Sequence, residues 1–480
     1  MKYLQYILKS SLLVGLIAFV SSCEDYLDIN TDPNNPTVAP LTGLMTSTTF
    51  ETGNNVQDLG GITAFYVQQL ASPNPASSTD IHDEVSYGNT WFNLYNVMTD
   101  LSDLELQAEE AGATEYLGAT KILKALNLAM TLDAWGDIPY EEAFFAETLT
   151  PAYDDDQTLY AEVQQLLDEG IIELQREGST ATIGNDDFIF GGDTDRWLKL
   201  AHGLKARYLL HLSETDQYDP QAVLAQIDQG LASSGDDAQV AYFEEERNPW
   251  WSVANSNANL ILGGWISEQM VEAMDGTTFG YVDPRQILMY DTTDAGEFIG
   301  TPNGAGRGDA PEQGARSTLV TGKFYTEETA PILVFTYFEQ KFIEAEAALD
   351  AGDRARAYSA YLEGIRAHMT KINIDEEDGG ISQEAIEAYL STPAVAVGAD
   401  NLTEELIYKE KHIAMFLHPE AWVDARRYDY QYQGMTLPAN HNPELNSQFI
   451  RRLIYPDSEI TRNGQNVPEV SLADNLWWDQ

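Results

Sequence analysis

Residues 335–369, FTYFEQKFIEAEAALDAGDRARAYSAYLEGIRAHM, hold the pattern on which the fold prediction depends. In their first half, apolar residues recur every three or four positions, the spacing of one face of an α-helix: Phe338, Phe342, Ala345 and Leu349. The Ala-Gly-Asp at 351–353 is typical of a helix end, and a second helical pattern follows at 354–369. The stretch therefore predicts two helices joined by a short turn.

The same periodicity appears on both sides of this hairpin. It predicts helices at residues 116–135, 159–174, 197–212 and 402–416. No run of alternating polar and apolar residues predicts a large sheet. We therefore expect an all-α fold whose apolar stripes form the core. The hairpin at 335–369 looks like a tetratricopeptide-type helix pair, but no clean period of about 34 residues predicts a regular solenoid.

Two long stretches break the helical pattern. Residues 71–87 are rich in Ser, Pro, Asn and Asp, and residues 275–328 carry many glycines, threonines and aspartates. Segments of this length without periodicity are usually functional or disordered. Aromatic residues interrupt the second stretch, so we expect it to be largely ordered, and a small β-hairpin is compatible with it.

Composition excludes several classes of function. The chain has 480 residues, with 26 Lys and Arg against 77 Asp and Glu, a formal net charge of −51. Such a charge argues against nucleic-acid binding and against docking on acidic lipid through a basic patch. The single cysteine excludes an internal disulfide and a zinc site built from cysteines.

The first residues look like an export signal. Residues 1–22 contain two lysines and an apolar run at 10–20, which is too short to span a bilayer. This run ends at Cys23, as in a bacterial lipobox, so we expect a signal peptide at 1–22 and lipidation of Cys23. Residues 23–40 then form a tether, and 41–480 form one domain anchored to a membrane. The alternative is an ordinary cleavage site beside an unrelated cysteine.

The sequence contains no local catalytic signature. It lacks the H-E-x-x-H and G-x-S-x-G patterns, and nothing local selects a glycosidase pair among its many carboxylates. The acidic runs 154–156 and 375–378 resemble calcium loops but do not fit the EF-hand pattern. We expect no cofactor and no catalytic metal. We expect these runs to be charged side chains in contact with solvent, and structural calcium is the alternative.

Several motifs in chain order resemble those of the SusD/RagB family of nutrient-binding outer-membrane lipoproteins. They are CEDYLD at 23–28, NTDPN at 30–34, WGDIPYEEA at 135–143, EAWVDARR at 420–427 and RRLIYP at 451–456. The acids after Cys23 also resemble the export signals of surface lipoproteins in Bacteroidetes. Single motifs are weak, but the ordered set covers nearly all of the mature chain.

The resemblance implies both a fold and a role. The fold is a SusD-like α-rich domain with four tetratricopeptide-type helix pairs packed against an irregular, loop-rich ligand-binding region. The role is non-catalytic: on the outer face of the outer membrane, the protein binds oligosaccharide or peptide and delivers it to a SusC-like TonB-dependent transporter. The alternatives are a secreted glycoside hydrolase with a carboxylate pair, and a helical-repeat scaffold that binds only protein.

Candidate ligand contacts follow from sugar chemistry, because sugar rings stack on aromatic faces and their hydroxyls need planar hydrogen-bonding partners. Three loop-like segments supply such residues: Tyr87, Trp91, Asn248, Trp250, Trp251, Tyr281 and Arg307. Trp91 also fits the helical spacing of a core residue. Trp250 and Trp251 are adjacent and must point apart on a regular element.

Arginines are also clustered near the end of the chain. Arg426, Arg427, Arg451 and Arg452 stand in a sequence with few basic residues and many acids. We therefore expect them to form buried structural ion pairs rather than ligand contacts.

Overall fold

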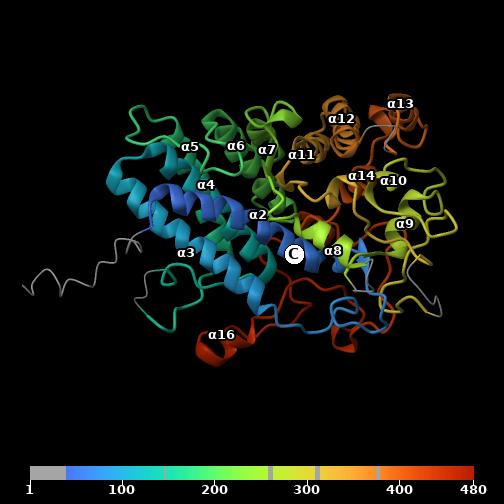
Figure 1. Ribbon diagram of the computed structural model, residues 1–480, viewed down its shortest axis with the longest axis horizontal. Coiled ribbons are helices and arrows are strands. Elements are labelled where there is room, and N and C mark those ends of the chain that lie inside the picture. The colour runs from blue at the N-terminus through green and yellow to red at the C-terminus, as the bar shows by residue number, and fades with distance from the viewer. Residues whose placement is uncertain (1–38, 145–147, 258–262, 309–313, 375–378, 480) are drawn as a thin grey trace, which may run out of the picture.

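The computed structural model describes residues 39–144, 148–257, 263–308, 314–374 and 379–479 (Figure 1). Helices dominate it and strands are few and short, which confirms the all-α prediction. The predicted signal peptide, Cys23 and nearly all of the tether lie outside the described residues. Within the described ranges, none of the helices combines the length and the apolarity that a membrane crossing requires.

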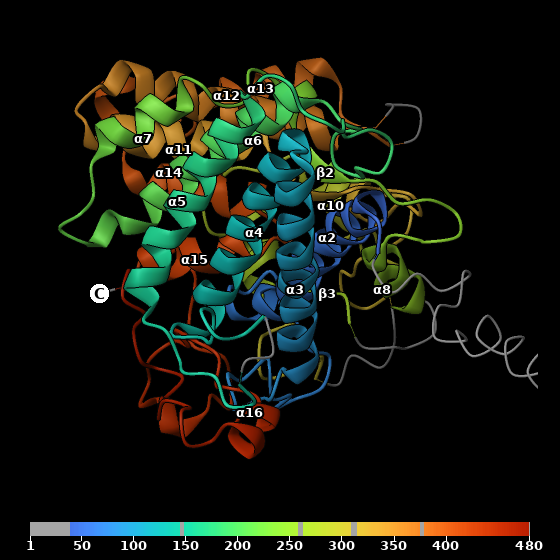
Figure 2. The same cartoon turned by 90° about the vertical axis from the view of Figure 1, so that its left-hand side faces the viewer.

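Four long helices form one half of the molecule (Figures 1 and 2). They are α2 (Leu41–Tyr66), α3 (Gly88–Ala111), α4 (Thr114–Trp135) and α5 (Asp156–Leu174). A Cβ on Gly118 of α4 would lie 2.6 Å from the Leu174 side chain and 2.9 Å from the carbonyl oxygen of Gly170. The glycines therefore allow the backbones of α4 and α5 to approach closely, and α4 is buried on nearly all sides.

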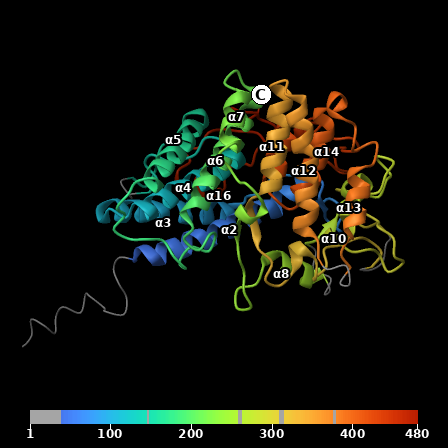
Figure 3. The ribbon, with the colours of Figure 1, turned by 90° about the horizontal axis from the view of Figure 1, so that it is seen from above.

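The hairpin predicted at 335–369 is confirmed in the other half. It consists of α11 (Tyr337–Asp350) and α12 (Arg354–Ile372), which lie side by side in Figure 3. Gly352 in the turn has φ +80°, and the Asp353 carboxylate caps α12 by accepting from the backbone N–H of Arg356. The helices that pack around this hairpin are α6 (Thr194–Leu210), α7 (Pro220–Ile227) and α14 (Glu404–Ala414).

Short elements complete the chain. The remaining helices are α8 (Pro249–Asn257), α9 (Glu268–Met274), α10 (Gln286–Met289), α13 (Gln383–Leu390), α15 (Glu420–Arg427) and α16 (Asp457–Arg462). Two antiparallel strand pairs join segments distant in sequence: β1 (Leu70–Ala71) with β3 (Trp265–Ile266), and β2 (Ala238–Val240) with β4 (Ile332–Phe335). The described part of 275–328 contains no hairpin of its own. Instead, Thr301 and Thr318 form bridges to Ser267 and Trp265.

The two irregular stretches are ordered against each other, as predicted for the second of them. The backbone N–H of Ala76 donates to the carbonyl oxygen of Gly304 (2.9 Å), and that of Arg307 donates to Pro73 (3.0 Å). Gly304 has φ +73°, and a Cβ there would lie 1.8 Å from the carbonyl oxygen of Ala439. Loops from three distant parts of the sequence therefore meet at this glycine, and they form the irregular region beside the helices.

Candidate functional site

A cleft of about 1120 Å³ opens between the start of α3 and α16. One wall comes from α2 and the first turns of α3, the opposite wall from α16, and the rest from Pro139, Ala143, Leu149 and Pro151. Figures 1 and 2 both place α16 beneath the lower end of α3. The volume is slightly above the roughly 300–1000 Å³ typical of small-molecule pockets, so the cleft has room for an oligomeric ligand.

Hydrogen bonds hold the two walls of the cleft in place. The backbone N–H of Asp457 donates to the Ser86 hydroxyl (3.1 Å), which ties α16 to the segment before α3. The Asn463 side-chain amide donates to the carbonyl oxygen of Pro151 (2.8 Å), and the Tyr153 hydroxyl donates to the Glu459 carboxylate (3.1 Å). The cleft is therefore shaped before a ligand arrives.

Apolar side chains face the cleft on both sides of its opening. Phe92 on α3 is 62% exposed and Leu149 is 92% exposed, so both present apolar surface to the cleft. Trp91 also borders the cleft but is buried, with its ring centroid 4.8 Å from that of Tyr95 and 5.2 Å from that of Trp135. Trp91 thus supports the wall, and Phe92 presents the free aromatic face.

Polar side chains also line the cleft. Asn89 and Arg462 are exposed, and Asp58 is half-buried on α2, where its carboxylate accepts from the Asn93 side-chain amide (3.0 Å). Burial raises the pKa of Asp58 above its usual value, and the nearby Glu51 carboxylate adds to the rise while the Asn93 hydrogen bond opposes it. The cleft therefore combines an apolar platform with hydrogen-bonding side chains.

Two of the seven predicted contact residues, Tyr87 and Trp91, line this cleft, and the other five do not. The Tyr87 hydroxyl lies 2.9 Å from that of Thr79 and 3.1 Å from that of Tyr66, so it also joins the irregular stretch to α2. Phe92 was not predicted. It stands within a helical run next to Trp91, and periodicity alone gives no signal that it faces a groove.

The segment around α8 has a different environment. Asn248 is fully buried and accepts from the backbone N–H groups of Trp250 (2.7 Å) and Trp251 (3.2 Å), so it caps α8. Trp250 is 4% exposed, whereas Trp251 is half-buried with the Arg247 guanidinium 4.9 Å from its ring centroid. The adjacent tryptophans thus point apart, as expected, and only Trp251 offers a partly free face.

The last two predicted contacts, Tyr281 and Arg307, are also half-buried and away from the cleft. The Lys409 ammonium lies 5.1 Å from the Tyr281 ring centroid, and the Arg307 guanidinium lies 6.0 Å from that of Trp265. Both side chains therefore already make cation–π contacts inside the fold.

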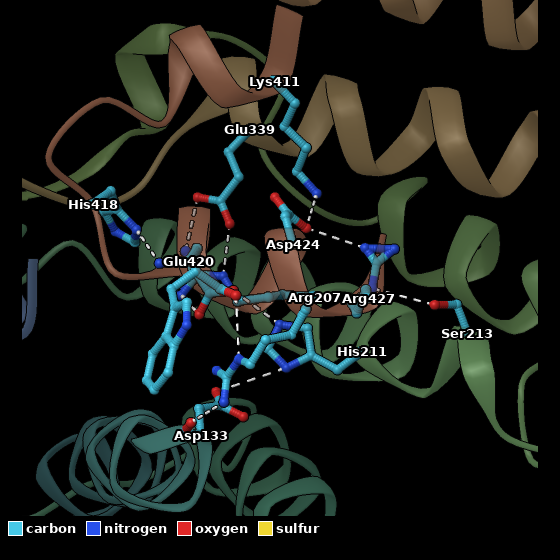
Figure 4. Close-up of polar contacts among 12 residues, drawn as sticks. Asp133, Arg207, His211, Ser213, Glu339, Lys411, His418, Glu420, Asp424 and Arg427 are labelled. Carbon is cyan, nitrogen blue, oxygen red and sulfur yellow. Dashed lines mark hydrogen bonds and ion pairs between the residues drawn. The ribbon is translucent and has the colours of Figure 1, made fainter. Parts of the chain in front are cut away.

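A buried network of charges joins α4, α6, α11 and α15 (Figure 4). Arg207 donates to both carboxylate oxygens of Glu339 (2.7 Å each) and lies 3.6 Å from Glu420. Burial alone would lower the pKa of Arg207, but the Glu339 and Glu420 carboxylates outweigh it and raise that pKa above its usual value. The guanidinium therefore stays charged in the core.

Of the four clustered arginines near the chain end, only Arg427 forms buried ion pairs as predicted. Arg426 and Arg452 are buried against backbone carbonyl oxygens, and Arg451 forms its ion pairs at a half-buried position. Arg427 donates to Glu346 (2.6 Å) and Asp424 (3.1 Å), and the Lys411 ammonium binds the same two carboxylates. Arg426 is 1% exposed and donates to the backbone carbonyl of Asp133 (2.7 Å). These side chains cross-link helices and are not available to a ligand.

One part of this network has the groups of an acid–base site. His211 Nε2 lies 2.9 Å from Glu420, and its Nδ1 lies 3.2 Å from the Tyr160 hydroxyl, which donates to Asp133. Burial raises the pKa of Asp133 to about 6, with His211 opposing and Glu420 adding to the rise. The side chains of His211, Glu420 and Asp133 are at most 7% exposed, however, so a substrate cannot reach them.

The acidic run 154–156 makes hydrogen bonds to the backbone. Asp154 accepts from the N–H groups of Tyr140 (2.8 Å) and Glu141 (2.9 Å), Asp155 caps α5, and Asp156 accepts from Trp477 (3.0 Å). The second run, 375–378, lies outside the described residues. Calcium at either place stays a sequence prediction.

Comparison with known proteins agrees with this architecture. The sequence model of a SusD-like family, described as starch-binding and associating with the outer membrane, matches residues 33–456. No curated protein sequence matches the chain.

Solved structures share the fold. A SusD/RagB family protein from Bacteroides thetaiotaomicron is 22% identical over 92% of this chain and 99% of its own, with a TM-score of 0.75. A chitin-binding protein is 21% identical over 92% and 100%, with a TM-score of 0.76. A chitin-binding SusD homologue from Flavobacterium johnsoniae is 19% identical over 91% and 98%, with a TM-score of 0.74. At these identities, the likeness is one of fold.

Proposed function

The chain belongs to the SusD-like family of starch-binding proteins that associate with the outer membrane, and on this premise we propose that it captures a saccharide in the cleft between α3 and α16. The observation that carries the proposal is the exposed ring of Phe92 on a wall of that cleft. The same cleft is lined by side chains that can hydrogen-bond hydroxyls, so it has both kinds of group that a sugar requires.

The protein releases the bound saccharide without having cleaved it. The group that resembles an acid–base site, His211 with Glu420 and Asp133, is buried in the network of Figure 4, out of reach of a glycan. The partner that receives the saccharide is a SusC-like TonB-dependent transporter. This part of the proposal rests on the sequence motifs shared with the SusD/RagB family, and peptide is the alternative cargo.

Replacing Phe92 by alanine should weaken saccharide binding about tenfold, because stacking on an aromatic ring contributes roughly 0.5–1.5 kcal/mol beyond the area that it buries. Calorimetry against a panel of neutral oligosaccharides and of peptides measures the affinities. Chromatography of the oligosaccharides after long incubation shows whether they stay intact.

The matched control is Phe243→Ala, because Phe243 is also exposed (38%) but packs against Phe50 and Phe188 outside the cleft. It should leave the affinity unchanged. If a saccharide binds wild type and F92A with the same affinity, the site lies elsewhere. The same conclusion follows if F243A weakens binding as much as F92A does. Shortened oligosaccharides would indicate a glycoside hydrolase instead.

We also propose that Cys23 carries the lipid that holds the protein on the membrane. Its support is the lipobox-like sequence before Cys23 together with the membrane association of the family. In C23S, the protein should move from the membrane fraction to the soluble fraction of cells broken without detergent. S22A keeps the cysteine and should stay with the membranes, and C23S remaining there would contradict the anchor.

A further inference from the structure

The charged side chains that line the cleft are unevenly balanced. Three of them are carboxylates, Asp58, Asp457 and Glu459, and one is a guanidinium, Arg462. Starting from the proposed saccharide site, we propose that this imbalance makes the cleft select saccharides with free amino groups over those with carboxylate or sulfate groups. The selection concerns the ligand's charge, and the proposed function itself does not depend on it.

The three carboxylates are available to a ligand. None of them forms an ion pair within the part of the chain that the structure describes. Asp58 accepts one hydrogen bond from the Asn93 amide, and Glu459 accepts one from the Tyr153 hydroxyl. Asp457 is exposed on the first turn of α16. An ionised carboxylate can accept about four hydrogen bonds, so each retains capacity for an ammonium group.

These carboxylates also lie on opposite walls of the cleft. Asp58 belongs to α2, whereas Asp457 and Glu459 belong to α16. An oligosaccharide lying along the cleft would therefore pass between them. Arg462 is at the far end of α16 and is the one lining cation among the described residues, so it can pair with a single acidic substituent at most.

Charges beyond the lining reinforce the negative potential. The whole chain carries a formal charge of −51. Walls of low dielectric concentrate such a field within a cleft, so an ammonium is attracted there and an anion is repelled.

The physical consequence is a difference in binding affinity between glycans that are identical except for one charged group. An ammonium donates charge-assisted hydrogen bonds to carboxylates, which are shorter and stronger than those of a hydroxyl. A carboxylate at the same ring position meets like charges on both walls. Both effects weaken in high salt because exposed charges are screened over about 10 Å at 0.1 M.

The experiment compares three forms of one backbone that differ only at C6: the 6-amino, the unmodified and the 6-carboxylate hexasaccharides. It uses two backbones, α-1,4-linked and β-1,4-linked glucose, at neutral pH, where the primary amine is charged. Calorimetry with the full-length mature protein should show the amino form binding at least tenfold more tightly than the carboxylate form. High salt should reduce this ratio.

The variant D58N/D457N/E459Q should bring the ratio between the amino and carboxylate forms close to one. The matched control E109Q/D216N/E245Q removes the same charge from exposed positions outside the cleft and should keep the wild-type ratio. The salt dependence of the wild type serves as the test if the triple variant does not fold.

Each outcome separates the two proposals. Carboxylate forms that bind as tightly as amino forms, or a ratio that survives in the cleft variant, overturn the charge selection and leave saccharide capture standing. If no form of either backbone binds, the result counts against saccharide capture in this cleft, and the selection is rejected with it.

Discussion

Replacing Arg207 by methionine should lower the free energy of unfolding by about 3–5 kcal/mol, the usual result of removing one partner from a buried ion pair. The Arg207 and Glu339 side chains are at most 3% exposed, so the carboxylates of Glu339 and Glu420 would remain in the core without a compensating cation. Methionine keeps most of the side-chain volume, which limits the contribution of a cavity. Urea unfolding followed by tryptophan fluorescence measures the change.

The exposed pair Arg366–Glu387 provides the control, because its side chains are 40% and 50% exposed. Ion pairs of this kind contribute about 0–1 kcal/mol, so R366M should change stability little. Equal losses in R207M and R366M would mean that the buried network is not what holds α6, α11 and α15 together. A smaller loss in R207M/E339M than in R207M alone would show that the cost comes from the orphaned carboxylate.

The helices of this network could be predicted from the sequence, but their partners could not. The periodic runs around Trp197 and Phe338 are local patterns, and α6 and α11 follow them closely. The pairing of Arg207 with Glu339 joins residues 132 positions apart. With 77 acidic residues in the chain, no local rule selects that carboxylate. Burial of the arginines was predictable because bases are scarce; the choice of partner needed the fold.

The longest of the described helices, α2, has a sequence that only weakly predicts a helix. α2 (Leu41–Tyr66) is rich in threonine and glycine, residues with poor helix propensity. In the structure, the hydroxyls of Thr48, Thr49 and Thr52 donate to carbonyl oxygens four residues earlier, and all three side chains are buried. Packing against α3, α4 and α15 therefore stabilises a helix that its own sequence does not favour.

The candidate cleft also combines residues that could be recognised from the sequence with residues that only the fold brings together. The segment with Tyr87 and Trp91 was recognised from its aromatic and polar residues, and it does border the cleft. Asn248 has the same kind of composition but caps α8, and the Asn-Pro pair at the start of a helix was a usable signal for that role. The opposite wall, α16, lies more than 300 residues later in the chain, so only the fold brings it to Phe92.

The stability of the protein should also fall as the pH is lowered from about 6.5 to about 4, and His412 should contribute to the fall. His412 on α14 is 3% exposed, and neither ring nitrogen has a hydrogen-bond partner in the described structure. Burial lowers its pKa to about 4, although the Asp424 carboxylate acts in the opposite direction. In the unfolded chain a histidine titrates near 6.5.

Between these two pH values the unfolded chain binds a proton that the native protein does not, so unfolding becomes easier as the pH falls. At about 1.4 kcal/mol per pH unit, this one group accounts for up to about 3 kcal/mol.

H412F keeps an aromatic ring against Tyr432, whose centroid lies 4.8 Å from that of His412, but cannot bind the proton. Urea unfolding at several pH values should therefore show a shallower loss of stability in H412F than in wild type. Y432F alters the same ring pair but removes no group that titrates in this pH range, so it should leave the slope unchanged. An H412F slope as steep as that of wild type would mean that the acid sensitivity arises elsewhere, for instance from His82, which is fully buried, or from His418, which is half-buried. Burial lowers the pKa of each to about 3.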